Sequence, residues 1–212
     1  MDEVLAHYPN SLHTTIGGDH SITAPIVRAI SNAHPGKKIG IVQFDTHLDM
    51  RDFSVGRTNG SPIRQLVEEG YVEGQHVYNI GLHGFYNATS LIEAATKHRI
   101  NMITLKKMRA QGPQKTIADV FEQLQAEVDI IYVTVDMDVL DVAYAPGVPS
   151  ATPGGMRSDE LFDLLFEVGK QKVSAIDFVC IDPLRDVAMQ TVKATSFAYL
   201  TFMASTYLHH HR

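Results

Sequence analysis

The sequence predicts an α/β fold of three layers, in which helices cover both faces of a mostly parallel sheet. Short apolar runs alternate with longer amphipathic segments along the chain, which is typical of β-α-β units. The run IIYVTV at 130–135 is almost continuously apolar, as expected of a strand that is buried on both faces of a parallel sheet. With 212 residues, of which 44% are hydrophobic, the chain has material for one domain, and we expect residues 1–212 to form it.

Six strands and six helices are expected in chain order. The runs of apolar or β-branched residues are Leu12–Ile16, Ile39–Phe44, His76–Ile80, Met102–Leu105, Ile130–Val135 and Val173–Ile181. Amphipathic patterns predict helices near Ser21–His34, Ile63–Glu69, Ser90–His98, Gln114–Ala126, Ser158–Gly169 and Asp186–Met203. Because ligands of open parallel sheets bind beyond the carboxyl ends of the strands, the residues that follow each run are the first candidates for a site.

Three of these helices carry favourable residues at their ends. Ser21 is expected to cap the first helix. Pro62 stands in the first turn of the second helix, and Gly70 follows its last turn. Ser158 precedes two acidic residues, which suit the positive end of a helix dipole. These end signals support the predicted helical segments.

Three of the predicted strand ends carry aspartates and histidines, in the segments GGDHS at 17–21, FDTHLD at 44–49 and VDMDVLD at 135–141. Asp45, His47 and Asp49 are spaced by two residues, and Asp136 and Asp138 repeat that spacing. In an extended chain such residues point to the same face, about 6.5–7 Å apart. Neighbouring carboxylates at the end of an apolar strand need a cation between them. Lysine and arginine are scarce in these segments, so the pattern predicts a metal site.

The candidate ligands are His20, Asp45, His47, Asp49, Asp136 and Asp138. Imidazole and carboxylate donors without thiolate suit Mn, Fe, Co, Ni or Zn better than Mg or Ca. The set exceeds what one tetrahedral ion needs, which predicts two ions about 3.5–4 Å apart that activate one hydroxide between them. Each segment alone also fits ordinary turn and capping chemistry, but their joint occurrence at three strand ends favours the metal centre.

These three segments resemble the signature motifs of the ureohydrolase superfamily, which includes arginases, agmatinases and formimidoylglutamases. The family motifs GG-x-HS, D-A-H-x-D and S-x-D-x-D-x-x-D-P-x-x-APG correspond here to GGDHS at 17–21, DTHLD at 45–49 and TVDMDVLDVAYAPG at 134–147. The resemblance extends from about Thr15 to Ala204 and implies an arginase-like α/β fold with two Mn²⁺ per subunit. It implies one Mn²⁺ on His20, Asp45, Asp49 and Asp136, and the other on His47, Asp45, Asp136 and Asp138.

The flanking segments resemble the formimidoylglutamase branch. These are Met50-Arg51, the segment NGSPIRQ at 59–65, and APGVP at 145–149 followed by TPGG at 152–155. Asn59 stands where arginases and agmatinases have a histidine. The resemblance implies hydrolysis of N-formimidoyl-L-glutamate to L-glutamate and formamide, a step of histidine degradation. The alternatives are a guanidino hydrolase that releases urea, as agmatinase and arginase do, a non-catalytic metal-binding relative, and a two-metal phosphoesterase.

Several residues are candidates for contact with the substrate. Arg51, Arg57 and Arg64 are suited to bind an anionic substrate through paired hydrogen bonds, although each also fits a solvated surface charge. Cys180, in the segment VCIDP, occupies the place of a family glutamate that contacts the cationic head of the substrate. A thiol cannot offer that paired hydrogen bond, and we expect a buried strand thiol rather than a nucleophile. The substrate-binding prediction is therefore Arg51, Asn59, Arg64 and Cys180.

Two further residues are candidates for proton handling. Asp141 is expected to move a proton or orient the leaving amine, or else to cap its own loop. His83 stands where relatives often have arginine, and is expected to shuttle a proton or to serve as a polar residue at a strand end.

The remaining features restrict the class of protein. A net charge of −6 argues against a general nucleic-acid binder, and no apolar run reaches the roughly 18–20 residues of a membrane span. One cysteine excludes a disulfide framework and Cys-rich zinc modules, and the acidic, polar start is not a secretory signal. We expect a cytoplasmic homo-oligomer that acts on a small molecule. Family members have further N-terminal strands, so we also expect an N-terminally truncated domain or an exposed sheet edge.

Overall fold

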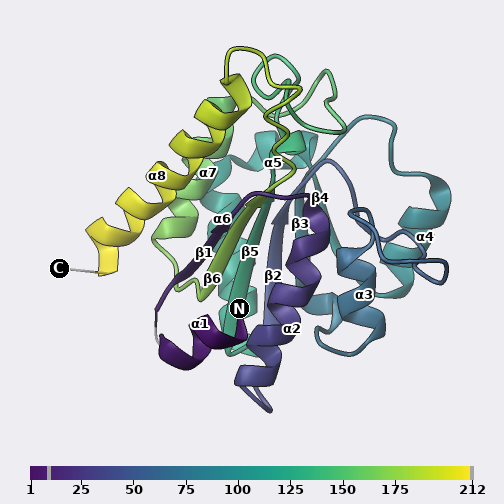
Figure 1. Cartoon of the computed structure of the whole chain (residues 1–212), viewed down its shortest axis with the longest axis vertical. Helices are drawn as coiled ribbons and strands as arrows, with labels where there is room; N and C mark the ends of the chain where they lie inside the picture. Colours follow the sequence, from purple (N-terminus) through teal and green to yellow (C-terminus); the bar gives the residue numbers. More distant parts are fainter. Residues whose placement is uncertain (9–10, 211–212) are drawn as a thin grey trace.

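A single parallel sheet organises the computed structural model of the protein, which describes residues 1–8 and 11–210. The strand order is β1-β6-β5-β2-β3-β4, and the neighbouring strands in this order are parallel (Figure 1). The strands are β1 (His13–Ile16), β2 (Ile39–Phe44), β3 (Val77–Leu82), β4 (Asn101–Thr104), β5 (Ile130–Asp136) and β6 (Ala175–Val179). The predicted parallel sheet is confirmed.

Helices cover both faces of the sheet, so the predicted three-layer architecture is confirmed as well. One face carries α1 (Asp2–His7), α2 (Thr23–Ala33), α3 (Pro62–Glu68) and α4 (Thr89–Lys97). The other face carries α5 (Leu105–Gln111), α6 (Pro113–Glu127), α7 (Ser158–Gly169) and α8 (Gln190–His210). Side chains alternate between the two layers along each strand. Ile41 of β2 therefore belongs to the same apolar cluster as Val27 of α2, whereas the next residue, Val42, belongs to the cluster that contains Phe121 of α6.

Some predicted element bounds are wrong. Leu105 begins α5 instead of ending β4, because the Thr104 hydroxyl accepts a hydrogen bond from the Lys107 N–H at 3.2 Å and caps a helix there. The last strand ends at Val179, two residues early, because Cys180 has a φ of +62°, which breaks the extended chain. The short helices α1 and α5 were not predicted.

Two helix starts also differ from the prediction. The side chain that accepts the Ser21 N–H, at 2.9 Å, belongs to Asp19, which caps the 3₁₀ turn η1 (His20–Ile22) that leads into α2. The helix α8 begins at Gln190, four residues late, and the Asp186 carboxylate accepts the N–H groups of Thr191 and Val192 at 2.9 and 3.0 Å. The Pro62 and Ser158 starts lie where the sequence places them.

The connectivity places a crevice at the middle of the sheet. The chain leaves β2 for β3 and β4 on one side, and returns to β5 and β6 on the other. Ligands of open α/β sheets bind at such a switch point, beyond the carboxyl ends of the strands. The register pairs Phe44 with Val135, so Asp45 and Asp136 follow at the same level of the sheet.

The strand β1 forms one edge of the sheet, and within residues 1–8 and 11–210 no strand pairs with its outer side. The exposed edge expected from the sequence is therefore present in the described part of the chain. None of the described helices is long and apolar enough to span a membrane.

Candidate metal centre

Six side chains from three loops meet beyond the carboxyl ends of β2 and β5. His20 comes from η1 after β1, Asp45 to Asp49 follow β2, and Asp136 and Asp138 lie at the end of β5 and in the 3₁₀ turn η3 (Met137–Val139). Of the six, only the His47 side chain is more than a few percent exposed, at 15%. The structure therefore brings all six predicted ligands together.

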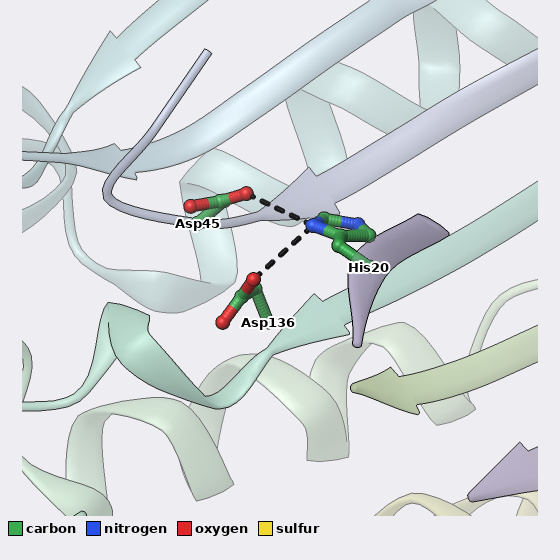
Figure 2. Close-up of side chains that lie close together, drawn as sticks. All are labelled: His20, Asp45 and Asp136. Carbon is green, nitrogen blue, oxygen red and sulfur yellow. Dashed lines mark ion pairs between the residues drawn. The ribbon is translucent and has the colours of Figure 1, made fainter. Parts of the chain in front are cut away.

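The first group surrounds one ring nitrogen of His20. His20 Nδ1 lies 2.7 Å from Asp49 Oδ2, 3.1 Å from Asp136 Oδ2 and 3.3 Å from Asp45 Oδ2. Figure 2 shows Asp45 and Asp136 directed from their separate chain segments at the same nitrogen. One nitrogen thus faces three carboxylate oxygens.

The second group surrounds His47. Its Nδ1 lies 3.0 Å from Asp138 Oδ2 and 3.4 Å from Asp45 Oδ1. The two oxygens of Asp45 therefore face different histidines, Oδ2 toward His20 and Oδ1 toward His47. A carboxylate placed in this way joins the two groups into one centre.

Local turns, rather than extended chain, bring the ligands together. Asp45 Oδ1 accepts the His47 N–H at 2.6 Å, and Asp136 Oδ1 accepts the Asp138 N–H at 2.9 Å. Each is an Asx turn, in which an aspartate caps the chain two residues on. Asp49 has a φ of +52°, a left-handed conformation that non-glycine residues adopt rarely. The expected extended spacing at the strand ends is therefore wrong, although the residues do converge.

The electrostatics of the centre are those of negative groups that are buried together. Burial raises the pKa of Asp49 to about 6, and the Asp45 charge adds to this effect. Burial likewise raises the pKa of Asp138, and Asp136 raises it further. Burial alone would lower the pKa of His47, but Asp138 and Asp45 outweigh it and raise the pKa to about 11. The carboxylates therefore compete for any positive charge nearby.

The residues present fit divalent metal ions. Within the described residues, His20 Nδ1, Asp49 Oδ2 and Asp138 Oδ1 are buried and make no hydrogen bond. Two groups have the spacing of a metal site, namely His20, Asp45 and Asp136, and Asp45, His47 and Asp138. Imidazole nitrogen with carboxylate oxygen is a donor set for Mn²⁺, Fe²⁺, Co²⁺ or Zn²⁺. Because the groups share Asp45, the arrangement suits two adjacent ions.

A cavity of about 130 Å³ opens onto this centre. Four of the six candidate ligands line it, namely His47, Asp49, Asp136 and Asp138. The rest of its wall is Arg51, Asn59, Gly60, Tyr86, Leu91, Pro149, Ser150 and Cys180. The floor of the cavity is acidic and consists of the carboxylates of Asp49, Asp136 and Asp138, whereas the wall combines polar and apolar side chains.

The structure separates the three candidate arginines. Arg51 lines the cavity, and among the described residues no carboxylate pairs with its guanidinium. A side chain at Gly60 would meet the Arg51 Cδ at 2.7 Å, so glycine makes room for the arginine. Arg57 pairs with Glu69 at 2.7 Å, and Arg64 pairs with Glu68 at 2.8 Å. Neither of these two lines the cavity.

Cys180 and Asn59 both line the cavity. The thiol is 4% exposed, and its pKa is raised by burial and then by Asp136. A thiol that stays protonated is a poor nucleophile. This agrees with the expectation that Cys180 is not the attacking group.

Asp141 and His83 lie outside the cavity wall. Asp141 accepts backbone N–H groups from Ala143 at 2.8 Å, Gly154 at 2.6 Å and Gly155 at 3.2 Å. Those bonds hold its pKa below the ordinary value, against a smaller effect of burial. His83 Nδ1 lies 2.7 Å from the Gly81 carbonyl, to which it donates. Both contacts stabilise loops, and the expected roles in proton transfer stay predictions.

Replacing Asp141 with asparagine is expected to lower the free energy of unfolding near pH 7 by about 1–2 kcal/mol, because charge-assisted hydrogen bonds are lost. Since folding lowers the pKa of Asp141, its stabilisation is complete above about pH 4 and is lost as the pH falls through the folded value. The difference in the free energy of unfolding between parent and variant should therefore be smaller at pH 3 than near pH 7. Urea unfolding at both pH values measures it.

The matched control is Asp119→Asn, because Asp119 forms an exposed pair with Lys115 in α6 and should contribute less than about 0.5 kcal/mol. If Asp141→Asn abolished turnover while leaving unfolding unchanged at both pH values, the loop role would be wrong and a catalytic role would replace it.

Sequence reasoning missed several side chains that hold the ligand loops. Gln43 Nε2 donates to Asp45 Oδ2 at 2.6 Å, and Asn79 donates to the His47 carbonyl. Asn87 donates to the Thr46 carbonyl at 2.8 Å and accepts the Leu48 N–H at 3.0 Å. Gln43 and Asn79 carried a signal, since each is a polar residue inside a fully buried strand.

Tyr86 was missed as well. Its ring meets the His47 imidazole edge-on, with 5.6 Å between the ring centroids, and it lines the cavity. Nothing in the sequence around an exposed loop tyrosine distinguishes it from any other surface aromatic residue.

Comparison with known proteins finds similar sequences and structures. The model of the arginase family matches residues 1–208. The formimidoylglutamase of Halalkalibacterium halodurans is 38% identical over 205 residues, which cover 96% of this chain and 64% of the relative. The crystal structure of formimidoylglutamase from Bacillus subtilis has a TM-score of 0.92 at 34% identity, over 98% of this chain and 64% of that chain.

A third relative is known with metal. The crystal structure of Trypanosoma cruzi formiminoglutamase with Mn²⁺ has a TM-score of 0.87 at 25% identity, over 97% of this chain and 69% of that chain. The match to this chain covers 64% of the length of the Halalkalibacterium halodurans relative.

Proposed function

Because the chain belongs to the arginase family, we propose that it hydrolyses the C–N bond of a linear amidine, N-formimidoyl-L-glutamate, to L-glutamate and formamide. The observation that carries the proposal is the cavity that joins an acidic floor to Arg51, which has no carboxylate partner among the described residues. The formimidoylglutamases of Halalkalibacterium halodurans and Bacillus subtilis support the choice of substrate.

The cavity matches this substrate at both ends. The amidine end is basic, and the floor presents the carboxylates of Asp49, Asp136 and Asp138. The glutamate end carries two carboxylates, and Arg51 can bind one of them through two parallel hydrogen bonds. A substrate held at both ends has its amidine carbon directed at the floor, where attack by water would release the amine of glutamate.

Two Mn²⁺ ions are part of the proposal, and the Mn²⁺ in the Trypanosoma cruzi relative supports them. His20, Asp45, Asp49 and Asp136 would hold one ion, and His47, Asp45, Asp136 and Asp138 the other. Such ions supply Lewis acidity, which makes water nucleophilic near neutral pH, and they offset the charge of the buried carboxylates. The protein's own share is to fix the donors through the Asx turns and to bind and orient the substrate.

A comparison of substrates tests the proposal. The chain is purified, loaded with Mn²⁺ and supplied in parallel with N-formimidoyl-L-glutamate, agmatine, arginine and 4-guanidinobutyrate, and formamide and urea are measured. We expect formamide from the first compound and no urea from agmatine, which has no carboxylate for Arg51. Urea from agmatine alone would place the chain among guanidino hydrolases. Two bound equivalents of metal without any turnover would make it a non-catalytic relative.

Replacing Arg51 with glutamine is expected to lower kcat/KM for N-formimidoyl-L-glutamate about 10- to 100-fold, mainly through KM, because a charge-assisted contact to the substrate is lost. Arg64→Gln is the matched comparison, since Arg64 is paired with Glu68 and lies outside the cavity wall. We expect it to change kcat/KM by less than about twofold. If Arg64→Gln lowered kcat/KM more than Arg51→Gln did, Arg64 would be the residue that binds the substrate carboxylate.

The proposal also includes a cytoplasmic location and a homo-oligomeric state. The unpaired outer edge of β1, within the described residues, favours self-association. Light scattering coupled to size-exclusion chromatography tests the oligomeric state.

A further inference from the structure

A buried polar network lies behind His20, on the side of the ring away from the carboxylates. His20 Nε2 lies 2.9 Å from Thr134 Oγ1 on β5. Asp177 on β6 accepts hydrogen bonds through Oδ2 from Thr23 Oγ1 at 2.6 Å and from the Tyr132 hydroxyl at 2.5 Å. All five side chains are at most 1% exposed.

The sheet register places the two central members together. Thr134 and Asp177 are paired residues of the parallel β5–β6 ladder, and Thr134 Oγ1 also lies 3.5 Å from Thr23 Oγ1. Asp177 does not line the cavity, so it cannot contact the substrate there. A buried carboxylate is costly unless it is hydrogen-bonded, which raises the question of what Asp177 contributes.

The number of hydroxyl protons restricts the direction of the hydrogen bonds. Thr23 and Tyr132 each have one hydroxyl proton, and each donates it to Asp177. Thr23 therefore has no proton left for Thr134. The Thr134 hydroxyl can direct its one proton toward Thr23 and Asp177, where only acceptors remain, or toward His20 Nε2. In the first arrangement its oxygen presents a lone pair to His20, and His20 Nε2 is the donor.

We propose that Asp177, acting through Thr134, holds His20 with its proton on Nε2 and so keeps Nδ1 available as a metal ligand. The inference rests on the metal centre of the proposed function. With the opposite direction of bonding, the proton would lie on Nδ1, where Asp45, Asp49 and Asp136 converge, and no ion could bind to that nitrogen. Histidines that bind metals generally donate their other ring N–H to a polar partner in this way. Asp177 is therefore a positioning residue, which lies behind Thr134 in the sheet and does not line the cavity.

Titration of the metal-free protein with Mn²⁺ tests the proposal. Calorimetry measures the binding, and the electron paramagnetic resonance spectrum reports on the bound Mn²⁺. Thr134→Val keeps the shape of the side chain and removes its hydroxyl. We expect it to weaken one of two Mn²⁺ sites about 10- to 100-fold, the range for lost outer partners of metal ligands, and to leave the His47 site near the parent value. The spectrum should change from that of two coupled ions to that of one isolated ion at subsaturating Mn²⁺.

Asp177→Asn is the direct variant and is expected to weaken the same site. Because Asp177 acts through Thr134, the double variant should bind no more weakly than Thr134→Val alone, so the two effects should not add. Thr134→Ser keeps the hydroxyl and should restore the affinity to within about threefold of the parent.

Thr116→Val is the matched control, because Thr116 is a buried threonine of α6 whose hydroxyl donates to the Gly112 carbonyl at 2.8 Å. It should lose stability without any change in Mn²⁺ binding. Equal Mn²⁺ affinities of the parent, Thr134→Val and Asp177→Asn would overturn the inference and leave the proposed function intact, as would an equal weakening of both sites. A parent that bound no Mn²⁺ would overturn the inference together with the metal centre, whatever the substrate assay showed.

Discussion

Asp45→Asn is expected to remove both metal ions and to lower turnover by more than about 100-fold. Loss of an outer partner of a metal ligand costs about 10- to 100-fold, and loss of a ligand itself should cost more. The reason is the position of this carboxylate, whose Oδ2 faces His20 and whose Oδ1 faces His47. Asparagine is uncharged and offers one oxygen where aspartate offers two, so one group loses its donor and both groups lose the shared negative charge. Its NH₂ group would also face either the Gln43 amide or the His47 N–H, both of which donate to Asp45.

Metal content by mass spectrometry and formamide release measure the two effects on the same preparations. Asp119→Asn is a suitable control, because it makes the same chemical change in an exposed pair on α6. Two equivalents of bound metal in Asp45→Asn would contradict the bridging role. Loss of turnover with full metal content would instead place Asp45 in contact with the substrate.

The fold and the convergence of the six candidate ligands were largely predictable because both follow from short-range patterns. The apolar runs mark buried strands, and the carboxyl ends of parallel strands meet at one edge of a sheet. The aspartates and histidines after three of those runs therefore had to come close together. What the sequence pattern could not show was the turn geometry, since Asp136 and Asp138 converge through an Asx turn rather than through extended chain.

The supporting residues were less accessible, because their partners are distant in the sequence. Whether an arginine is free depends on the acid beside it. Arg64 pairs with Glu68, whereas Arg51 has no carboxylate partner among the described residues. Thr134 and Asp177 are polar residues in buried strands, which is a usable signal. Their link to His20 spans 114 residues of sequence for Thr134 alone, and only the fold reveals it.

The acidic floor also connects metal binding to stability, because folding without metal forces several carboxylates into one buried space. Burial raises the pKa of Asp49 and of Asp138, so the charged forms of these groups are destabilised in the folded protein. An ion that binds the folded centre removes this penalty and has no equivalent site in the unfolded chain. Metal binding should therefore stabilise the fold as well as enable the reaction.

Loading the metal-free protein with Mn²⁺ is accordingly expected to raise Tm by about 5–10 °C per occupied site, with turnover appearing over the same titration. At about 100 times Kd, a ligand of the native state adds roughly 2.7 kcal/mol, and in a domain of this size 1 kcal/mol corresponds to about 2–4 °C. Carboxylates and imidazoles bind metal only after they lose their protons, so the increase in Tm should diminish as the pH falls. Differential scanning fluorimetry with and without a chelator measures it, with Asp45→Asn as the variant that should not respond. Asp45 is the carboxylate that faces both His20 and His47, and no arrangement of the remaining donors replaces it. If Tm rose equally in Asp45→Asn, the stabilising ion would therefore bind elsewhere.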